Sequence, residues 1–152
     1  RNEDLVALAL GPEDLSVALD AAPGVQALAY AAARLVMAAR AHDLHVYACP
    51  GSLAEFRDLA AWRSTLASGR ALGSDGALCI HPAQLEAVHA VFSPDPEDVA
   101  WAHRVMAAWR TGAGAVALDG RMIDRPVVLR AMRTLAKADR AGASADREAV
   151  HG

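Results

Sequence analysis

Residues 6–14 read VALALGPED, and this stretch decides the fold class. The short apolar run Val6–Leu10 is closed by Gly11-Pro12, which is typical of a buried strand in a parallel sheet. The pattern recurs along the chain. Two further strands are predicted at His45–Ala48 and Ala77–Ile80, with helices at Pro23–Ala41, from Ser52 to about Ser68, and at Pro82–Phe92. Strands that alternate with helices in this way build βαβ units around a parallel sheet, so the sequence predicts an α/β fold.

Local sequence signals support the predicted helices. Apolar residues recur every three or four positions in Pro23–Ala41, as on one face of an amphipathic helix. Ser52 and Glu55 have the spacing of a capping box, so we expect a helix that begins at Ser52. Leu59, Ala60 and Leu66 would be buried in that helix, together with Phe56.

A helix, a hairpin and a second helix are predicted beyond residue 92. Asp95-Pro96 has the pattern of a helix start, with a capping acid before a proline at the first helical position. Residues 114–126 read GAVALDGRMIDRP, in which Asp119-Gly120 is a turn between two apolar runs and Asp124 ends the second run. The last helix is predicted at Pro126–Arg140. We therefore expect three regions: residues 1–92, an extension at 93–140, and a flexible tail at 141–152.

The composition excludes several classes of protein. The 152 residues carry a net charge of −3 without a basic stripe, which gives no reason to expect nucleic acid as a partner. No apolar run approaches the ~20 residues of a membrane span, so no membrane partner is expected. Cys49 and Cys79 lack a paired-thiol spacing and are predicted to be reduced and packed, which favours a cytoplasmic location.

Three phrases resemble the citrate lyase β-subunit-like branch of the HpcH/HpaI aldolase family. They are residues 9–15 (ALGPEDL), residues 72–84 (LGSDGALCIHPAQ) and residues 119–126 (DGRMIDRP), and residues 92–102 (FSPDPEDVAWA) are also similar to that family. The resemblance implies that residues 1–92 are the C-terminal portion, about three βα units, of a TIM (β/α)₈ barrel. It further implies a C-terminal helix–hairpin–helix extension at residues 93–140. In the family this extension packs on or swaps to a neighbouring subunit of a homo-oligomer, a trimer or hexamer.

The resemblance also implies an activity. Family members are Mg²⁺-dependent (or Mn²⁺-dependent) lyases that cleave citryl-, citramalyl- or malyl-CoA to acetyl-CoA and a keto acid. Their metal ligands are a glutamate on an earlier strand and the aspartate of a G-x-E-D phrase, which matches Asp14 here. We expect the glutamate, and an arginine that binds the keto acid, to lie in the half of the barrel that this sequence does not contain. The backbone N–H groups of Glu13 and Asp14 would hold the substrate carboxylate. Asp124 matches the aspartate that moves a proton on the α-carbon of the CoA thioester, in the active site of a neighbouring subunit.

Each of these residues also has a purely structural interpretation. Asp14 has the position of an ordinary first-turn acid, and Asp124 that of a helix N-cap. His81 could be a ligand, but a histidine satisfied by hydrogen bonds is the preferred interpretation. Arg121 could meet the phosphates of CoA or be a solvated surface residue.

Three departures from the family pattern support an alternative function. Ala32, Ala48 (or Cys49) and Ala77 stand where family members carry charged residues. The alternative is a catalytically impaired paralogue that acts as a binding or assembly subunit. A malate-synthase-like or thioesterase activity on the same scaffold is a further possibility. The sequence leaves open which acyl-CoA is used and in which direction the reaction runs.

Overall fold

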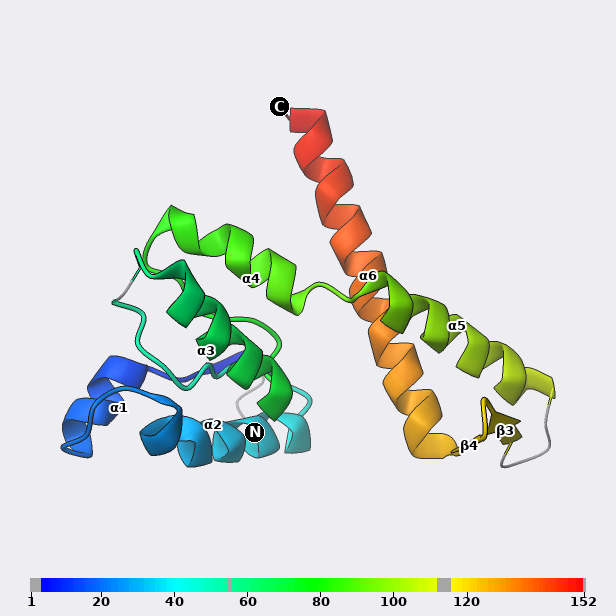
Figure 1. Ribbon diagram of the computed structural model, residues 1–152, viewed down its shortest axis with the longest axis horizontal. Coiled ribbons are helices and arrows are strands. Elements are labelled where there is room, and N and C mark those ends of the chain that lie inside the picture. Colours follow the sequence, from blue (N-terminus) through cyan, green and yellow to red (C-terminus); the bar gives the residue numbers. More distant parts are fainter. Residues whose placement is uncertain (1–3, 55, 112–115, 152) are drawn as a thin grey trace. The chain divides into compact units, whose positions relative to one another are not determined.

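The chain divides into two compact units, residues 1–92 and residues 93–152 (Figure 1). The computed structural model describes residues 4–54, 56–111 and 116–151. Glu55 of the predicted capping box and residues 112–115 before the predicted hairpin lie outside the described residues. Each unit has its own hydrophobic core and is described by itself.

The first unit is built from two parallel strands and the helices that follow them. The elements are β1 (Ala7–Ala9), α1 (Pro12–Ala18), α2 (Val25–Ala41), β2 (His45–Tyr47), α3 (Leu59–Leu72), the 3₁₀ helix η1 (Pro82–Gln84) and α4 (Leu85–Phe92). Leu8 of β1 pairs with Val46 of β2 in a parallel register. The predicted α/β class is confirmed, and the surrounding barrel stays a prediction.

The core of this unit has two clusters. In the first, α2 packs its predicted apolar face, including Ala32 and Val36, against Leu10 and Val46. In the second, α3 contributes Trp62 and Leu66 to a cluster with Cys49 and Ala87. Burial at a three- to four-residue spacing along α2 follows from the period of the helix, as the sequence predicted.

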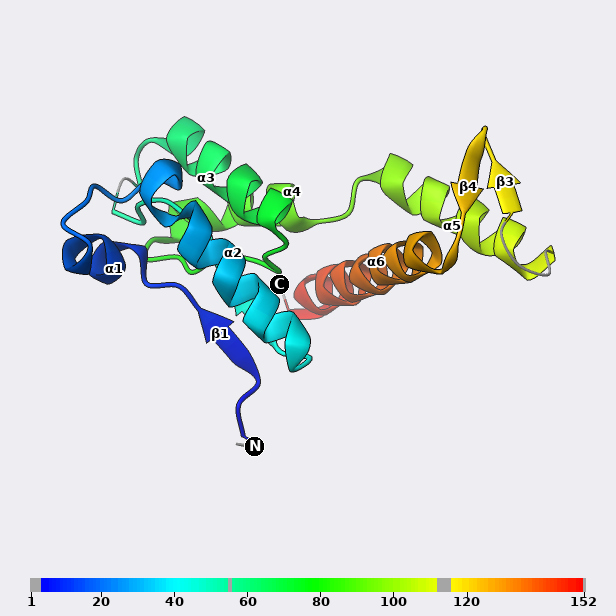
Figure 2. The same ribbon diagram turned by 90° about the horizontal axis from the view of Figure 1, so that it is seen from below.

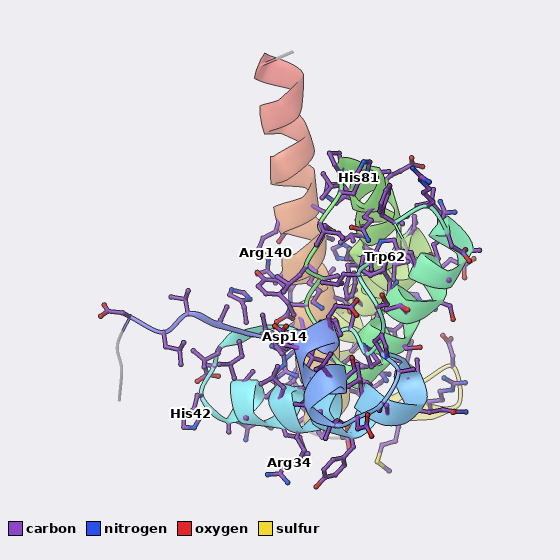
Figure 3. The ribbon with its side chains drawn as sticks, turned by 90° about the vertical axis from the view of Figure 1, so that its left-hand side faces the viewer. Asp14, Arg34, His42, Trp62, His81 and Arg140 are labelled. Carbon is purple, nitrogen blue, oxygen red and sulfur yellow. The ribbon has the colours of Figure 1, made fainter. Side chains whose placement is uncertain are left out.

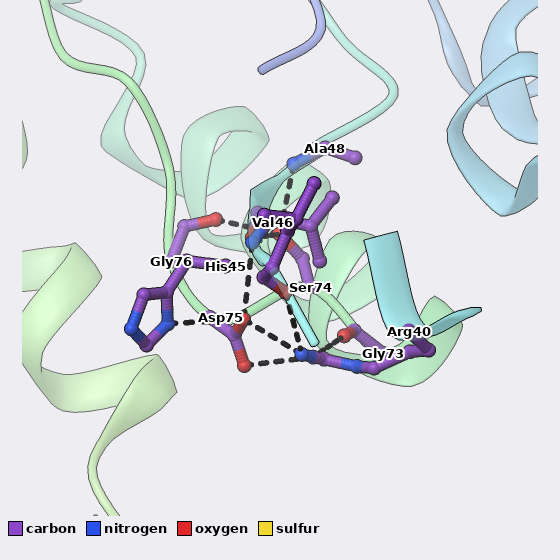
Figure 4. A network of polar contacts seen from close by, with 9 residues as sticks. Arg40, His45, Val46, Ala48, Gly73, Ser74, Asp75 and Gly76 are labelled. Atoms are coloured by element: carbon purple, nitrogen blue, oxygen red, sulfur yellow. Dashed lines mark hydrogen bonds and ion pairs between the residues drawn. The ribbon is translucent and has the colours of Figure 1, made fainter. Parts of the chain in front are cut away.

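The predicted third strand at residues 77–80 was wrong, because a turn occupies the edge of β2 that this strand would pair with. Along that edge, Val46 N–H donates to Asp75 Oδ2 at 3.1 Å, and Val46 C=O accepts from Asp75 N–H at 2.8 Å (Figure 4). Ser74 Oγ accepts from Ala48 N–H at 2.8 Å and donates to Val46 C=O at 3.0 Å. The polar groups of the turn therefore satisfy β2 in place of a neighbouring strand.

Arg40 fixes this turn to the end of α2. Its guanidinium donates to both carboxylate oxygens of Asp75, at 2.7 and 3.0 Å, and to Gly73 C=O at 2.8 Å (Figure 4). Gly73 lies at φ +100, a left-handed conformation that glycine adopts without strain, and ends α3 as its C-cap. A two-bond Arg–carboxylate contact restrains the orientation of both side chains.

The predicted helix start at Ser52 was also wrong. Helix α3 begins at Leu59, and the Asp58 side chain caps it by accepting from Ala61 N–H at 2.9 Å. Ser52 donates to the carboxylate of Glu13 and accepts from Ala54 N–H at 3.0 Å, so its side chain is held in the loop before α3 and not at a helix start. Of the residues expected to be buried in the helix, Ala60 is exposed.

The second unit packs two helices and a hairpin. Its elements are α5 (Pro96–Thr111), β3 (Val116–Leu118), β4 (Arg121–Ile123) and α6 (Arg125–His151); Figure 2 shows the two strands as adjacent arrows. The strands are antiparallel, with Asp119 at φ +51 and Gly120 at φ +73 between them. Positive φ at both central residues is what a type I′ hairpin turn requires, and Asp-Gly is a favoured pair there.

The core of the second unit consists of Ala102, Val105, Ile123, Val128 and Ala131. The predicted end of the last helix at Arg140 was wrong, since α6 continues to His151. The flexibility of residues 141–152 stays a prediction. Among the described residues, no helix is long and apolar enough to cross a bilayer.

The turn beside β2 gives a test of the fold. Ser74→Ala should lower the free energy of unfolding of the intact protein by about 1–3 kcal/mol, because the buried Ala48 N–H loses its acceptor. Urea denaturation measures the change. Ser68→Ala, which removes a surface bond to Ser64 C=O in α3, is the control and should stay within about 0.5 kcal/mol of wild type. Equal losses in both variants would contradict the assigned role of Ser74.

Candidate functional site

Asp14 is an exposed acid in the first turn of α1, just beyond the carboxyl end of β1 (Figure 3). Its Oδ2 atom lies 3.5 Å from the place that a Cβ at Gly11 would take. The carboxyl ends of parallel strands are where α/β proteins place their ligands. The exposed Asp14 carboxylate is therefore accessible to a ligand at the edge of the sheet where α/β proteins bind ligands.

Glu13 points away from Asp14 and joins α1 to the loop after β2. Its Oε1 atom accepts from Ser52 Oγ at 2.6 Å and from Leu53 N–H at 2.9 Å. The hydrogen bond from Ser52 is the largest cause that lowers the pKa of Glu13; burial opposes it and the Leu53 N–H adds to it. The Glu13 side chain is thus an ionised anchor between two loops.

Gln84 holds the same loop from its other side. Its side-chain amide donates to Leu53 C=O at 3.1 Å, while Oε1 accepts from Ile80 N–H at 2.9 Å and from His81 N–H at 3.1 Å. The Gln84 side chain is fully buried, and its backbone C=O accepts from the indole N–H of Trp62 at 3.2 Å. Hydrogen bonds to Glu13 and Gln84 therefore connect the first turn of α1, the Leu53 segment and the His81 segment.

His81 is satisfied within this network. Its Nδ1 atom accepts from Ala83 N–H at 3.1 Å, and its ring stacks on Phe56 with centroids 4.5 Å apart. His81 and Gln84 form a capping box around η1. The interpretation of His81 as a hydrogen-bonded structural residue is confirmed.

The potential metal ligands of the described residues do not gather into a preformed cluster. Over residues 4–54, 56–111 and 116–151, no group of three or more His, Cys, Asp or Glu side chains could hold a metal ion. A closed site of the zinc type therefore does not fit these residues. Mg²⁺ differs, because it takes one or two carboxylates and completes its octahedron with water and substrate oxygens. The exposed carboxylate of Asp14 fits as one ligand of such an ion.

Asp124 is the N-cap of α6. Its Oδ1 atom accepts from Val127 N–H at 3.2 Å, and its C=O accepts from Val128 N–H at 3.0 Å. The carboxylate is half-buried. Beside it, Ile123 is 2% exposed in the core whereas Met122 is 70% exposed, so Met122 does not cover Asp124 within this chain. The capping interpretation is confirmed, and the catalytic role stays a prediction.

A hollow of about 360 Å³ on the second unit is lined by Ile123 and Val127, residues on either side of Asp124 in the sequence. Its walls include Arg121, Trp101 and Arg130, and the Arg130 guanidinium lies 4.8 Å from the centre of a Trp101 ring. Asp119 at the hairpin turn pairs with Arg104 at 3.3 Å. Arg121 is exposed, so its contact with a phosphate group stays a prediction.

The three alanines that depart from the family pattern are packing residues here. Ala32 and Ala48 are fully buried in the first core cluster, and Ala77 packs against the second. A charged side chain at such a position would need a partner to offset its burial. Both cysteines are free thiols, and burial, with a smaller effect of Cys79, raises the pKa of Cys49 to about 12. Cys49 is thus protonated and unreactive at neutral pH.

One pattern in the sequence points to part of this hydrogen-bond network. His81 and Gln84 have the spacing of the S/T-x-x-E/Q capping box, with histidine as the capping residue. The bonds from Ser52 and Leu53 to Glu13 have no comparable signal, because they join residues 39 and 40 positions apart.

The chain is similar in sequence to a known protein family and to several of its members. A model of the HpcH/HpaI aldolase/citrate lyase family matches residues 1–82. A (3S)-malyl-CoA thioesterase of Cereibacter sphaeroides is 36% identical over 141 residues, which cover 89% of this chain and 49% of the relative. The citrate lyase subunit beta of Escherichia coli is 32% identical over 147 residues, 93% of this chain and 48% of that protein.

The structure is also similar to solved structures. The crystal structure of CitE from Mycobacterium tuberculosis in complex with magnesium, acetoacetate and coenzyme A matches 88% of this chain and 51% of that chain, with a TM-score of 0.70 and 27% identity. The chain spans about half the length of the curated relatives that it matches.

The capping bond of Asp124 can be tested by measuring the free energy of unfolding of variants, without an activity assay. Asp124→Ala should lower the free energy of unfolding by about 1 kcal/mol, because Val127 N–H loses its acceptor, whereas Asp124→Asn keeps an oxygen acceptor and should lose less. Urea denaturation of the intact protein measures both. Asp139→Ala, at an exposed acid within α6, is the control and should change stability by less than about 0.5 kcal/mol. A loss for Asn as large as for Ala would contradict the capping role.

Proposed function

The chain belongs to the HpcH/HpaI aldolase/citrate lyase family, and from this premise we propose that it is part of a divalent-metal-dependent acyl-CoA carbon–carbon lyase. The substrate would be a 3-hydroxyacyl-CoA of the citryl, citramalyl or malyl type, cleaved to acetyl-CoA and a keto acid. The observation that carries the proposal is the exposed carboxylate of Asp14, in the first turn after a parallel strand and inside the segment that the family model matches.

Asp14 would be one ligand of Mg²⁺ or Mn²⁺, and the other protein ligand would be a glutamate on an earlier strand of the barrel. When bound, the metal would polarise the carbonyl oxygen of the keto acid as a Lewis acid. The presence of magnesium and acetoacetate in the M. tuberculosis relative supports this assignment. The N–H groups of Glu13 and Asp14 lie at the start of α1, where backbone donors favour an anion, and would hold the carboxylate of the keto acid.

Asp124 would move the proton that the reaction requires. In cleavage, the bond between the α-carbon of the thioester and the hydroxyl-bearing carbon breaks, and the hydroxyl loses its proton as the keto group forms. The α-carbon then gains a proton, so that one proton moves, net, from the hydroxyl group to the α-carbon. We assign its delivery to the Asp124 carboxyl group, and in the reverse direction the carboxylate removes it. Because Asp14 and Asp124 belong to different units, we propose that residues 93–140 serve the active site of a neighbouring subunit in a trimer or hexamer. The exposed Met122 beside Asp124 supports a partner surface there.

A thioesterase is the second candidate, since a relative with 36% identity is described as a (3S)-malyl-CoA thioesterase. Product analysis separates the two reactions. Cleavage of malyl-CoA yields acetyl-CoA and glyoxylate, whereas hydrolysis yields free CoA thiol and malate. A protein that binds acyl-CoA and forms neither set of products would be the catalytically impaired paralogue.

Replacement of Asp124 tests its role in proton transfer. Asp124→Asn should reduce kcat for keto-acid release by a factor of about 10²–10⁴, because the amide keeps the helix cap but cannot transfer the proton. Release of glyoxylate, pyruvate or oxaloacetate from the matching acyl-CoA measures the rate. Asp139→Asn is the matched control and should retain the wild-type rate. A wild-type rate in Asp124→Asn would remove this residue from the mechanism.

Metal dependence gives an independent test. EDTA should abolish cleavage, and added Mg²⁺ should restore it. Asp14→Asn should raise the Mg²⁺ concentration for half-maximal activity by at least about tenfold, because the ion loses a charged ligand. Asp20→Asn, at another exposed acid just after α1, should leave that concentration unchanged. Equal metal requirements in all three proteins would argue against Asp14 as a ligand.

A further inference from the structure

We propose that Glu13 is a positioning residue for Asp14: its carboxylate fastens the first turn of α1 to the Ser52–Leu53 segment and thereby sets the direction of the Asp14 carboxylate. The inference rests on the proposed role of Asp14 as a metal ligand. It concerns the side chain of Glu13, which acts through its neighbour and does not itself touch substrate or metal.

The carboxylate of Glu13 is held by two hydrogen bonds. One carboxylate oxygen, Oε1, accepts both the Ser52 hydroxyl at 2.6 Å and the Leu53 N–H at 2.9 Å. The Glu13 C=O accepts from the hydroxyl of Ser16 at 2.8 Å, so the residue is held through its backbone as well as its side chain. Hydrogen bonds to a charged acceptor are about twice as strong as neutral ones, which makes this an effective anchor.

The partner of Glu13 is itself fixed. The Leu53 peptide donates to Glu13 and accepts from the buried amide of Gln84 at 3.1 Å. Gln84 in turn is held by the N–H groups of Ile80 and His81 and by the Trp62 indole. Glu13 is therefore tied to a segment that is itself held by hydrogen bonds to the buried Gln84.

No side chain caps the start of α1, although the buried Pro12 at its first position presets the backbone there. Gly11 is the N-cap and offers no side-chain cap bond, and α1 has only 7 residues, a length at which an isolated helix is marginal. Adjacent residues on a helix do not face the same way, so Glu13 can point to the Ser52–Leu53 segment while Asp14 points to solvent. The direction of Asp14 then depends on the Glu13 anchor.

Binding of Mn²⁺ to the intact protein without substrate tests the proposal. Electron paramagnetic resonance of free Mn²⁺ gives the dissociation constant, and thermal unfolding of each variant reports its stability. Glu13→Ala should weaken Mn²⁺ binding about tenfold, as the loss of groups that orient metal ligands does. Glu13→Gln should retain most of the affinity, because its amide oxygen can accept both hydrogen bonds. Glu86→Ala, at an exposed glutamate in the first turn of α4, is the matched control and should bind as wild type.

A stability control separates positioning from general loss of fold. Asp58→Ala removes the N-cap of α3 in the same unit without touching the Glu13 anchor. It should lower the unfolding temperature while leaving Mn²⁺ affinity unchanged. If Asp58→Ala weakens Mn²⁺ binding as much as Glu13→Ala does, the effect of Glu13 is only structural and the proposal is overturned.

The outcomes distinguish the inference from the function on which it rests. An unchanged Mn²⁺ affinity in Asp14→Asn would remove the proposed metal ligand itself. Weakened binding in Asp14→Asn together with wild-type binding in Glu13→Ala would overturn the positioning role alone. Should Glu13→Ala fail to fold, Ser52→Ala decides instead: a severalfold loss of affinity supports the proposal, and wild-type affinity contradicts it.

Discussion

The backbone of β2 needs hydrogen-bond partners on both edges, and the way this need is met organises the first unit. One edge pairs with β1, and the other is satisfied by the Ser74–Asp75 turn, which Arg40 fixes to α2. A buried strand whose polar groups lacked partners would lose several hydrogen bonds at once. The turn therefore allows a two-stranded sheet to present an ordered carboxyl edge, and the loops that follow both strands carry Asp14, Ser52 and Leu53.

Those loops are connected to one another by polar side chains. Glu13 accepts from Leu53 N–H and Gln84 donates to Leu53 C=O, so the first turn of α1, the loop after β2 and η1 are joined by hydrogen bonds next to the exposed Asp14. In the second unit, the Asp124 side chain is instead held by the helix that it caps. One carboxylate is thus oriented by tertiary contacts, and the other by its own secondary structure.

The sequence predicted what depends on local pattern and missed what depends on distant partners. The apolar face of α2 follows from helix periodicity, and the start of α5 at Pro96 follows from the Asp95-Pro96 pattern. The predicted helix start at Ser52 was wrong, because the capping residue of α3 is Asp58 and Ser52 lies in a loop bonded to Glu13, 39 positions earlier. The strand at residues 77–80 was predicted from an apolar run, and no pattern in the sequence reveals that a turn fills the edge of β2. Asp14 and Asp124 were identified by family phrases, whereas the roles of Glu13 and Gln84 required coordinates.

The capping bond of Asp124 has a consequence for how this family can diverge. A lineage that gives up the reaction is still under selection to keep α6 folded, so an oxygen-bearing side chain at this position remains favoured after its chemistry has become dispensable. Aspartate can then drift to asparagine, serine or threonine with little loss of stability. Under the role in proton transfer that we propose for Asp124, a hydrogen-bonding but non-acidic side chain at position 124 would indicate a homologue that keeps the scaffold without that step.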